Sequence, residues 1–199
     1  QIATQDGGIG LLLVRHGQTA WNAERRFLGR TDIPLDDEGL RQAGRFAKAV
    51  PVAFDRVLSS PLQRALQTAM ALHRAPIVVD ALAELHQGEL EGLHATQAFE
   101  RYPGFFAHWT EDPATAEVPG GERLDACRDR AMEALEEIAS RAAPGETIAV
   151  VSHQMVIASV CCTIEGLPLA RWRERRLGNT QGTWLSYGGG AWSVIARRW

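Results

Sequence analysis

The sequence predicts an α/β fold, a three-layer sandwich in which helices cover both faces of a mainly parallel central sheet. Short apolar runs of strand length lie at 10–15, 56–60, 77–80 and 147–151. Segments with apolar residues at helical spacing alternate with them, at 40–50, 61–72, 122–141 and 154–164. Strands that alternate with helices are joined by crossovers, and crossovers place neighbouring strands parallel.

Local signals support the first elements in turn. The run 10–15 is apolar without alternation, as in a strand that is buried on both faces. The helix that follows has Asp36 or Asp37 at its N-cap, where a carboxylate accepts backbone N–H bonds. Pro61 comes directly after the second strand and is expected in the first turn of the next helix, since its fixed φ suits that position.

The second half of the chain begins with a segment rich in glycine and proline, 81–121, which predicts loops and short helices. Beyond it, 122–141 has the apolar stripe of an amphipathic helix. The run 154–164 is apolar on all sides and predicts a buried helix. Residues 183–187 and 192–196 flank three glycines and predict a closing β-hairpin.

Composition excludes several classes of protein. The chain has 199 residues, 23% charged, with a net charge of −3, so it lacks the basic surplus of a nucleic-acid-binding protein. Its longest apolar stretch, near 155–164, is shorter than the roughly 20 residues of a membrane span. Residues 1–9 lack the regions of a signal peptide and are expected to form a flexible tail. The 3 cysteines, two of them adjacent, predict a reducing, cytoplasmic location, and no Cys/His spacing matches a zinc site.

Chemically active side chains follow each predicted strand. Arg15 and His16 end the first, Arg64 follows the second, Glu84 follows the third and His153 follows the fourth. Ligands of open α/β sheets bind beyond the carboxyl ends of the strands, so these side chains are expected to converge. Arginine forks bind phosphate oxygens, a neutral imidazole is a nucleophile, and a carboxyl group can protonate a leaving oxygen. The pattern therefore predicts phosphoryl transfer through a phosphohistidine.

Blocks in a fixed order resemble the histidine phosphatase superfamily, the phosphoglycerate-mutase-like proteins. The blocks lie at 15–22, 59–65, 84–88, 119–122 and 152–153. An Arg-His-Gly motif alone is a weak signal, whereas five ordered blocks over about 11–187 are a strong one. The resemblance implies that 10–199 is a catalytic domain, in which 81–121 is an insertion that covers the substrate.

The resemblance also implies roles for individual residues. His16 would be the nucleophile, and Glu84 would protonate the leaving group and then activate water. Arg15, Arg64 and His153 would hold the phosphate. No metal or other cofactor is needed in this family.

Further contacts are implied at the substrate. Asn22 would hydrogen-bond the phosphate or the groups around it. Leu28, Gly29 and Gln154 belong to segments that look most like the small bacterial α-ribazole phosphatase and broad-specificity phosphatase branch, and we expect them to contact substrate. The function predicted is hydrolysis of a small phosphorylated metabolite.

Two other functions remain alternatives. One is a phosphoglycerate mutase that uses 2,3-bisphosphoglycerate. The short interval 85–152 and the single lysine, Lys48, disfavour it, because mutases of this superfamily usually carry a longer, more basic insertion. The other is a phospho-ligand binding protein without activity.

The C-terminal hairpin could form a homodimer or simply close the core.

Several residues have competing interpretations. Glu89 and Glu91 are alternatives to Glu84 as the proton donor. The run 171–176 reads better as a solvated helix face than as an interface or an anion patch. Three further histidines are expected at the surface or lining the pocket rather than on a metal, namely His86, His94 and His108. Trp21 and Trp109 are expected mainly to pack in the core or at its rim. The alternative is that they line the mouth of the substrate site.

Overall fold

A computed structural model describes residues 7–73 and 75–197 and contains a sheet of six strands. The strands are β1 (Ile9–Arg15), β2 (Arg56–Ser59), β3 (Ile77–Val78), β4 (Thr147–Ser152), β5 (Gly182–Gly188) and β6 (Ala191–Ala196). Their order across the sheet is β3-β2-β4-β1-β5-β6. The first four strands pair in parallel, whereas β5 pairs antiparallel with both β1 and β6. The predicted α/β class is confirmed.

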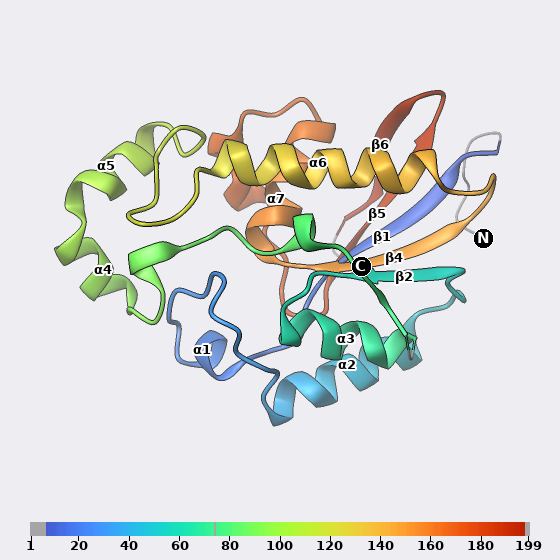
Figure 1. The fold of residues 1–199 in the computed structure, drawn as a ribbon, viewed down its shortest axis with the longest axis horizontal. Helices are drawn as coiled ribbons and strands as arrows, with labels where there is room; N and C mark the ends of the chain where they lie inside the picture. Colours follow the sequence, from blue (N-terminus) through green and yellow to red (C-terminus); the bar gives the residue numbers. More distant parts are fainter. Residues whose placement is uncertain (1–6, 74, 198–199) are drawn as a thin grey trace.

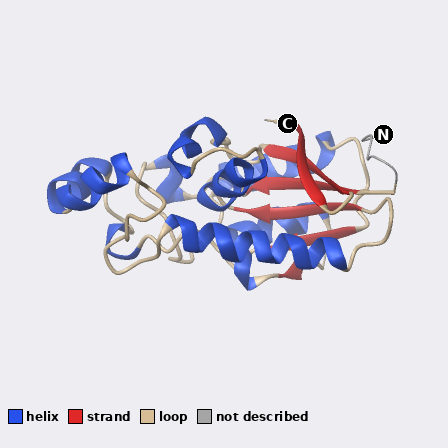
Figure 2. Ribbon diagram, turned by 90° about the horizontal axis from the view of Figure 1, so that it is seen from above, coloured by secondary structure: helices blue, strands red, loops and turns tan. Residues whose placement is uncertain are grey.

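Helices cover both faces of this sheet. The α-helices are α1 (Ala20–Ala23), α2 (Asp37–Ala49), α3 (Gln63–Leu72), α4 (Ala95–Arg101), α5 (Pro103–Glu111), α6 (Leu124–Ser140) and α7 (Gln154–Ile164). Short 3-10 helices are η1 (Asp80–Leu82), η2 (Gly88–Leu90) and η3 (Leu169–Arg175). Figure 1 shows α2 and α3 on one face and α6 and α7 on the other. Figure 2 shows that the helices of the insertion extend beyond one end of the sheet.

The central strand β1 is buried on both faces. Leu12 and Val14 pack with Phe46 of α2 in the smaller apolar cluster. Leu11 and Leu13 belong to the larger cluster, which α6 and α7 complete. Full burial of such a side chain stabilises the fold by about 2 kcal/mol. The strand that ends at the functional residues is therefore firmly fixed.

Three boundaries differ from those expected. The third strand ends at Val78, because Asp80 already begins η1, and both residues of this edge strand are about half exposed. Pro61 precedes the N-cap residue Leu62 rather than lying in the first turn of α3. Ile9 is buried and pairs with Tyr187, so the expected tail over 1–9 ends before it. Residues 1–6 lie outside the described residues.

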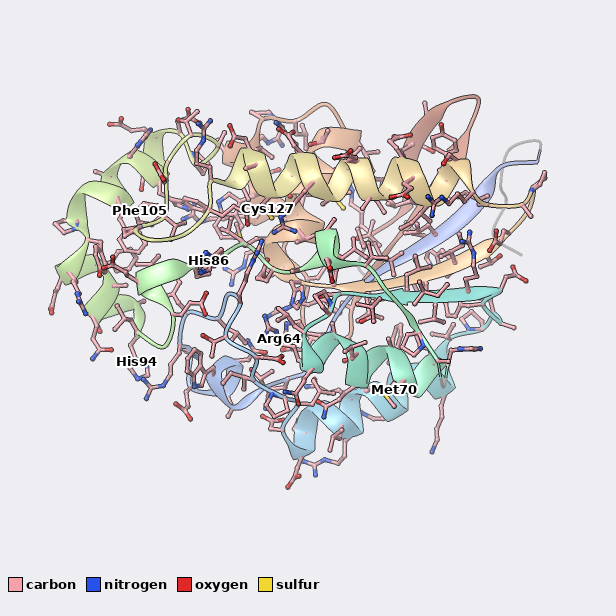
Figure 3. All side chains as sticks on the ribbon, viewed as in Figure 1. Arg64, Met70, His86, His94, Phe105 and Cys127 are labelled. Carbon is pink, nitrogen blue, oxygen red and sulfur yellow. The ribbon has the colours of Figure 1, made fainter. Side chains whose placement is uncertain are left out.

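Residues 81–121 form η2, α4, α5 and connecting loops, as expected. Gly88 has φ +47°, and a Cβ there would lie 2.2 Å from the carbonyl oxygen of Pro119, so the two ends of this segment approach closely. Figure 3 shows His94 and Phe105 in the part of the segment that extends away from the sheet. Trp109 is buried between Phe105 and Trp172, in agreement with a packing role.

Within the described residues, no single helix is long and apolar enough to cross a membrane. In the same part of the chain, α7 and η3 together have the length and apolar composition of a span, but they are bent by 113° relative to each other.

Candidate active site

Four elements bring polar side chains to the carboxyl edge of the sheet. His16 follows β1, and His153 follows β4 as the N-cap residue of α7. The centroids of these two imidazole rings lie 5.1 Å apart. Arg64 lies in the first turn of α3, and Glu84 follows η1. All four residues are buried, with at most 4% of their surface exposed.

The position of His16 determines which ring nitrogen carries the proton. Its Nδ1 lies 2.6 Å from the carbonyl oxygen of Gly17. Because a carbonyl only accepts, Nδ1 must be the donor, and Nε2 keeps its lone pair. Burial, and then the charges of Arg64 and Arg15, lower the pKa of His16 well below its ordinary value. A neutral imidazole with a free Nε2 is the form that acts as a nucleophile.

His153 presents a free ring nitrogen beside His16. Its Nε2 lies 2.6 Å from the Ser60 hydroxyl, which also accepts a bond from the backbone N–H of Leu62. Burial, followed by the charge of Arg64, lowers the pKa of His153, so only one ring nitrogen carries a proton at neutral pH. Nδ1 is buried and has no partner. When Ser60 donates its hydroxyl hydrogen to Nε2, Nδ1–H is left as a donor for an anion.

Backbone carbonyls fix the two arginines of the site. Arg15 donates from Nη1 to the carbonyl of Leu177 at 2.7 Å. Arg64 donates to the carbonyls of Gly29 and Thr31, at 2.6 and 3.0 Å. Burial lowers the pKa of both guanidinium groups, that of Arg64 to about 10, so both remain charged at neutral pH. The Nε of each is buried without a partner, which leaves fixed cationic donors suited to phosphate oxygens.

The carboxyl group of Glu84 lies at the N-terminus of α7. Its Oε1 accepts the backbone N–H groups of Leu85 at 2.8 Å and Met155 at 3.2 Å. Burial nevertheless raises the pKa of Glu84. The group therefore keeps its proton to a higher pH than an ordinary glutamate, as a proton donor must.

A cavity of about 650 Å³, including the space open to solvent, lies beside His16, Arg15 and Glu84. The expected site residues that line it are Arg15, His16, Asn22, Leu28, Glu84 and Gln154. Arg64 and His153 do not line it. Gly29 does not line it either, and its carbonyl instead holds Arg64. A Cβ at Gly29 would lie 2.6 Å from the backbone nitrogen of Gln87, so this close approach requires glycine.

The family model for branch 1 of the histidine phosphatase superfamily matches residues 11–199. The chain belongs to the histidine phosphatase superfamily.

Other members of the superfamily resemble this one over most of its length. Phosphoserine phosphatase 1 of Hydrogenobacter thermophilus is 32% identical over 168 residues, which is 82% of this chain and 79% of that protein. A probable phosphoglycerate mutase of Escherichia coli is 35% identical over 175 residues, 85% of this chain and 80% of that protein. A mycobacterial glucosyl-3-phosphoglycerate phosphatase, solved with VO3, superposes with a TM-score of 0.85 at 29% identity, covering 95% of this chain and 98% of that one.

Asn22 has a structural role beside the phosphatase cavity. Its Oδ1 accepts the backbone N–H of Thr19 at 3.2 Å and the amide of Asn179 at 3.4 Å. Asn179 also donates to the carbonyl of His16 at 3.0 Å. Asn22 therefore lines the cavity and also closes the N-terminal turn of α1.

Six residues that line the cavity were not predicted from the sequence. These are Arg26, Phe27, Gln87, Met155, Trp172 and Arg176. Trp172 and Arg176 lie within or just after η3, in the run that was expected to be a solvated helix face. That expectation was wrong for Arg175, whose side chain is 11% exposed and bonded to Glu165, whereas Arg176 is exposed as expected and also lines the cavity. The sequence signal that could have indicated a role at the cavity was Trp172, an aromatic residue within this run of arginines.

The alternative residues are engaged elsewhere. Glu89 accepts the hydroxyl of Tyr102. Glu91 accepts the backbone N–H groups of Arg30 and Thr31. Neither lines the cavity, whereas Glu84 does. Figure 3 shows His86 near the start of the insertion, and no group of three or more His, Cys, Asp or Glu suited to a metal occurs in 7–73 and 75–197.

Proposed function

We propose that this chain hydrolyses small phosphomonoesters through a phosphohistidine at His16 and uses no metal ion. The observation that carries the proposal is the buried His16 imidazole with Nδ1 bonded to a carbonyl and two arginines close by. Phosphoryl transfer depends mainly on positioning and charge stabilisation, and fixed donors in a buried site supply both. The relatives named as phosphatases support the same activity.

In the first step, the Nε2 lone pair of His16 attacks phosphorus in line with the ester oxygen. The P–O ester bond breaks as the P–N bond forms, and Glu84 gives its proton to the departing oxygen. Arg15, Arg64 and His153 offer donors to the equatorial oxygens. The alcohol leaves, and the carboxylate of Glu84 remains.

In the second step, water replaces the alcohol. Glu84 takes a proton from this water, whose oxygen attacks phosphorus. The P–N bond breaks, inorganic phosphate leaves, and His16 and protonated Glu84 are restored. One group thus acts first as an acid and then as a base.

The proposal includes three further properties of this protein. Residues 81–121 cover the substrate, the location is cytoplasmic, and the C-terminal hairpin supports a homodimer. The three cysteines are unpaired and buried, which supports a reducing location.

The test is to trap the phosphoenzyme. The wild-type protein is mixed with p-nitrophenyl phosphate in EDTA, quenched in alkali and weighed by intact mass spectrometry. We expect an acid-labile gain of one phosphoryl group, absent in His16→Ala, and a fall in turnover of about 1,000-fold or more in that variant. His73→Ala, at the other end of α3 from Arg64, is the control and should behave as wild type. Wild-type turnover in His16→Ala, or activity lost in EDTA and restored by zinc, would refute the proposal.

The two alternatives give different results. A mutase would convert 3-phosphoglycerate to 2-phosphoglycerate faster than it releases phosphate, when 2,3-bisphosphoglycerate is present. A binding protein would show affinity for phosphate by calorimetry and no turnover on any phosphomonoester.

A further inference from the structure

We infer that the cavity holds a second anion subsite, formed by Arg176, Trp172 and Gln154, which selects phosphomonoesters whose leaving group carries a carboxylate. This inference rests on the proposed function, because it identifies the class of alcohol that leaves. It concerns the part of the cavity beyond the groups that hold the phosphate.

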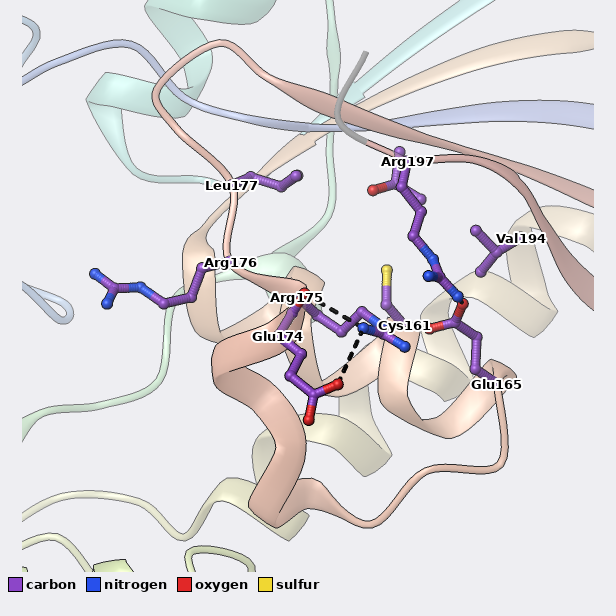
Figure 4. Close-up of a pocket in the computed structure, with 9 residues that line it drawn as sticks. Cys161, Glu165, Glu174, Arg175, Arg176, Leu177, Val194 and Arg197 are labelled. Carbon is purple, nitrogen blue, oxygen red and sulfur yellow. Dashed lines mark hydrogen bonds and ion pairs between the residues drawn. The ribbon is translucent and has the colours of Figure 1, made fainter.

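Arg176 differs from the arginines beside it. Arg171 is paired with Glu174, and Arg175 is paired with both Glu174 and Glu165. Within the described residues, Arg176 has no acidic partner, and its guanidinium lies 6.0 Å from the centre of the Trp172 ring. Figure 4 shows the side chain of Arg176 pointing away from Arg175 and its partners Glu174 and Glu165. It lines the cavity that contains His16, so its charge is available to a ligand there.

Two neutral donors without partners line the same cavity. The indole Nε1 of Trp172 and the amide Nε2 of Gln154 are buried and make no hydrogen bond. The amide orientation of Gln154 is fixed, because its Oε1 accepts the backbone N–H of Leu177 at 2.9 Å. A buried donor without a partner is costly, and a ligand oxygen would satisfy it. All the free groups of this subsite are donors, which matches a ligand group made only of acceptors.

The charge of the cavity lining agrees with a second anion. Its cationic residues are Arg15, Arg26 and Arg176, and its acidic residue is Glu84. Arg26 is already paired with Glu24, and Arg15 is assigned to the phosphate. Arg176 therefore remains for the leaving group. One guanidinium with two neutral donors suits a carboxylate, whereas an ammonium group would find no acceptor there.

The test compares two substrates with the same carbon skeleton. In 3-phosphoglycerate a carboxylate stands where sn-glycerol 3-phosphate has a hydroxymethyl group. We expect wild-type kcat/KM to favour 3-phosphoglycerate by about 10-fold or more, the scale of one charged hydrogen bond. Arg176→Ala should reduce this preference by about 10-fold, and so should Gln154→Glu, which replaces a donor with a negative charge and keeps the Leu177 bond.

Arg173→Ala is the matched control. It removes the same charge from the same turn, and its guanidinium also lies over Trp172, 4.7 Å from the ring centre, but it does not line the cavity. The control should keep the wild-type preference. Equal kcat/KM for both substrates in the wild type, or an equal change in Arg173→Ala and Arg176→Ala, would overturn the subsite.

Calorimetry separates failure of the subsite from failure of the proposed function. In the His16→Ala background, 3-phosphoglycerate should bind more tightly than glycerol 3-phosphate, and Arg176→Ala should remove the difference. This comparison needs no turnover. Equal affinities would reject the subsite even if phosphatase activity is found, and a phosphoenzyme that never forms would reject the function even if the affinities differ.

Discussion

Arg130 of α6 holds Glu122 through both oxygens of its carboxylate, with N–O distances of 2.8 and 3.0 Å. The same guanidinium donates to the backbone carbonyls of Ala81 and Glu84. Glu122 in turn accepts the backbone N–H of His86. One side chain therefore ties the segment that carries the proposed proton donor to the long helix behind it.

We expect Arg130→Ala to destabilise the protein by about 3 kcal/mol, because a largely buried carboxylate loses its bidentate partner and the carbonyls of Ala81 and Glu84 each lose a donor. Urea unfolding at neutral pH measures the change. Arg128→Ala, which removes a surface ion pair with Asp129, is the control and should cost less than about 1 kcal/mol. Equal losses in the two variants would show that the Arg130 contacts add nothing.

Replacement of Glu84 by Gln should affect substrates according to their leaving groups. An alkoxide needs a proton as it leaves, so phosphorylation of His16 by glycerol 3-phosphate should slow by about 100-fold or more. A p-nitrophenolate leaves without a proton, so phosphorylation of His16 by p-nitrophenyl phosphate should lose much less of its rate. Rapid-quench measurement of the first turnover separates this step from hydrolysis of the phosphoenzyme. An equal loss for both substrates would contradict the role of Glu84 as acid.

The raised pKa of Glu84 also predicts the pH dependence of stability. The pKa of this carboxyl group is higher in the folded than in the unfolded state. Its contribution to stability is therefore fully present below the unfolded pKa and is lost as the pH rises through the folded pKa. Glu84→Gln removes the ionisation, so its Tm should exceed that of the wild type above neutral pH. The difference should shrink at pH values below about 4.3, the ordinary pKa of glutamate. A Tm difference between Glu84→Gln and the wild type that widens as the pH falls would contradict this prediction.

Removal of the Ser60 hydroxyl should weaken phosphate binding through His153. In Ser60→Ala, Nε2 of His153 loses its partner, and the proton is no longer directed to Nδ1. We expect KM for p-nitrophenyl phosphate to rise by about 10-fold, the scale of one hydrogen bond to a charged group, with a smaller change in kcat. Ser60→Thr keeps the hydroxyl and should restore binding if the fold accepts the methyl group. Proton NMR of the His153 ring provides a second measurement, because the tautomer should change in the alanine variant.

The sequence predicted the elements that end in the proposed catalytic groups, since apolar runs of strand length are strong signals. It could not predict that β3 has only two residues, because that depends on how the chain turns into η1 at the sheet edge. It placed Gln154 at the substrate but not Arg176, because a run of arginines has the same pattern on a solvated face as beside a cavity. The burial of Arg175 against Glu165 is a tertiary contact that no local pattern carries.

The residues proposed to hold the phosphate and those proposed to bind the leaving group belong to different parts of the chain. His16 and His153 are attached to strands that are packed on both faces, whereas Arg176 follows a short 3-10 turn at the surface. Changes in that turn can therefore alter which alcohol is accepted without disturbing the reaction centre. Such modularity lets related proteins differ in substrate specificity while they share one chemical step.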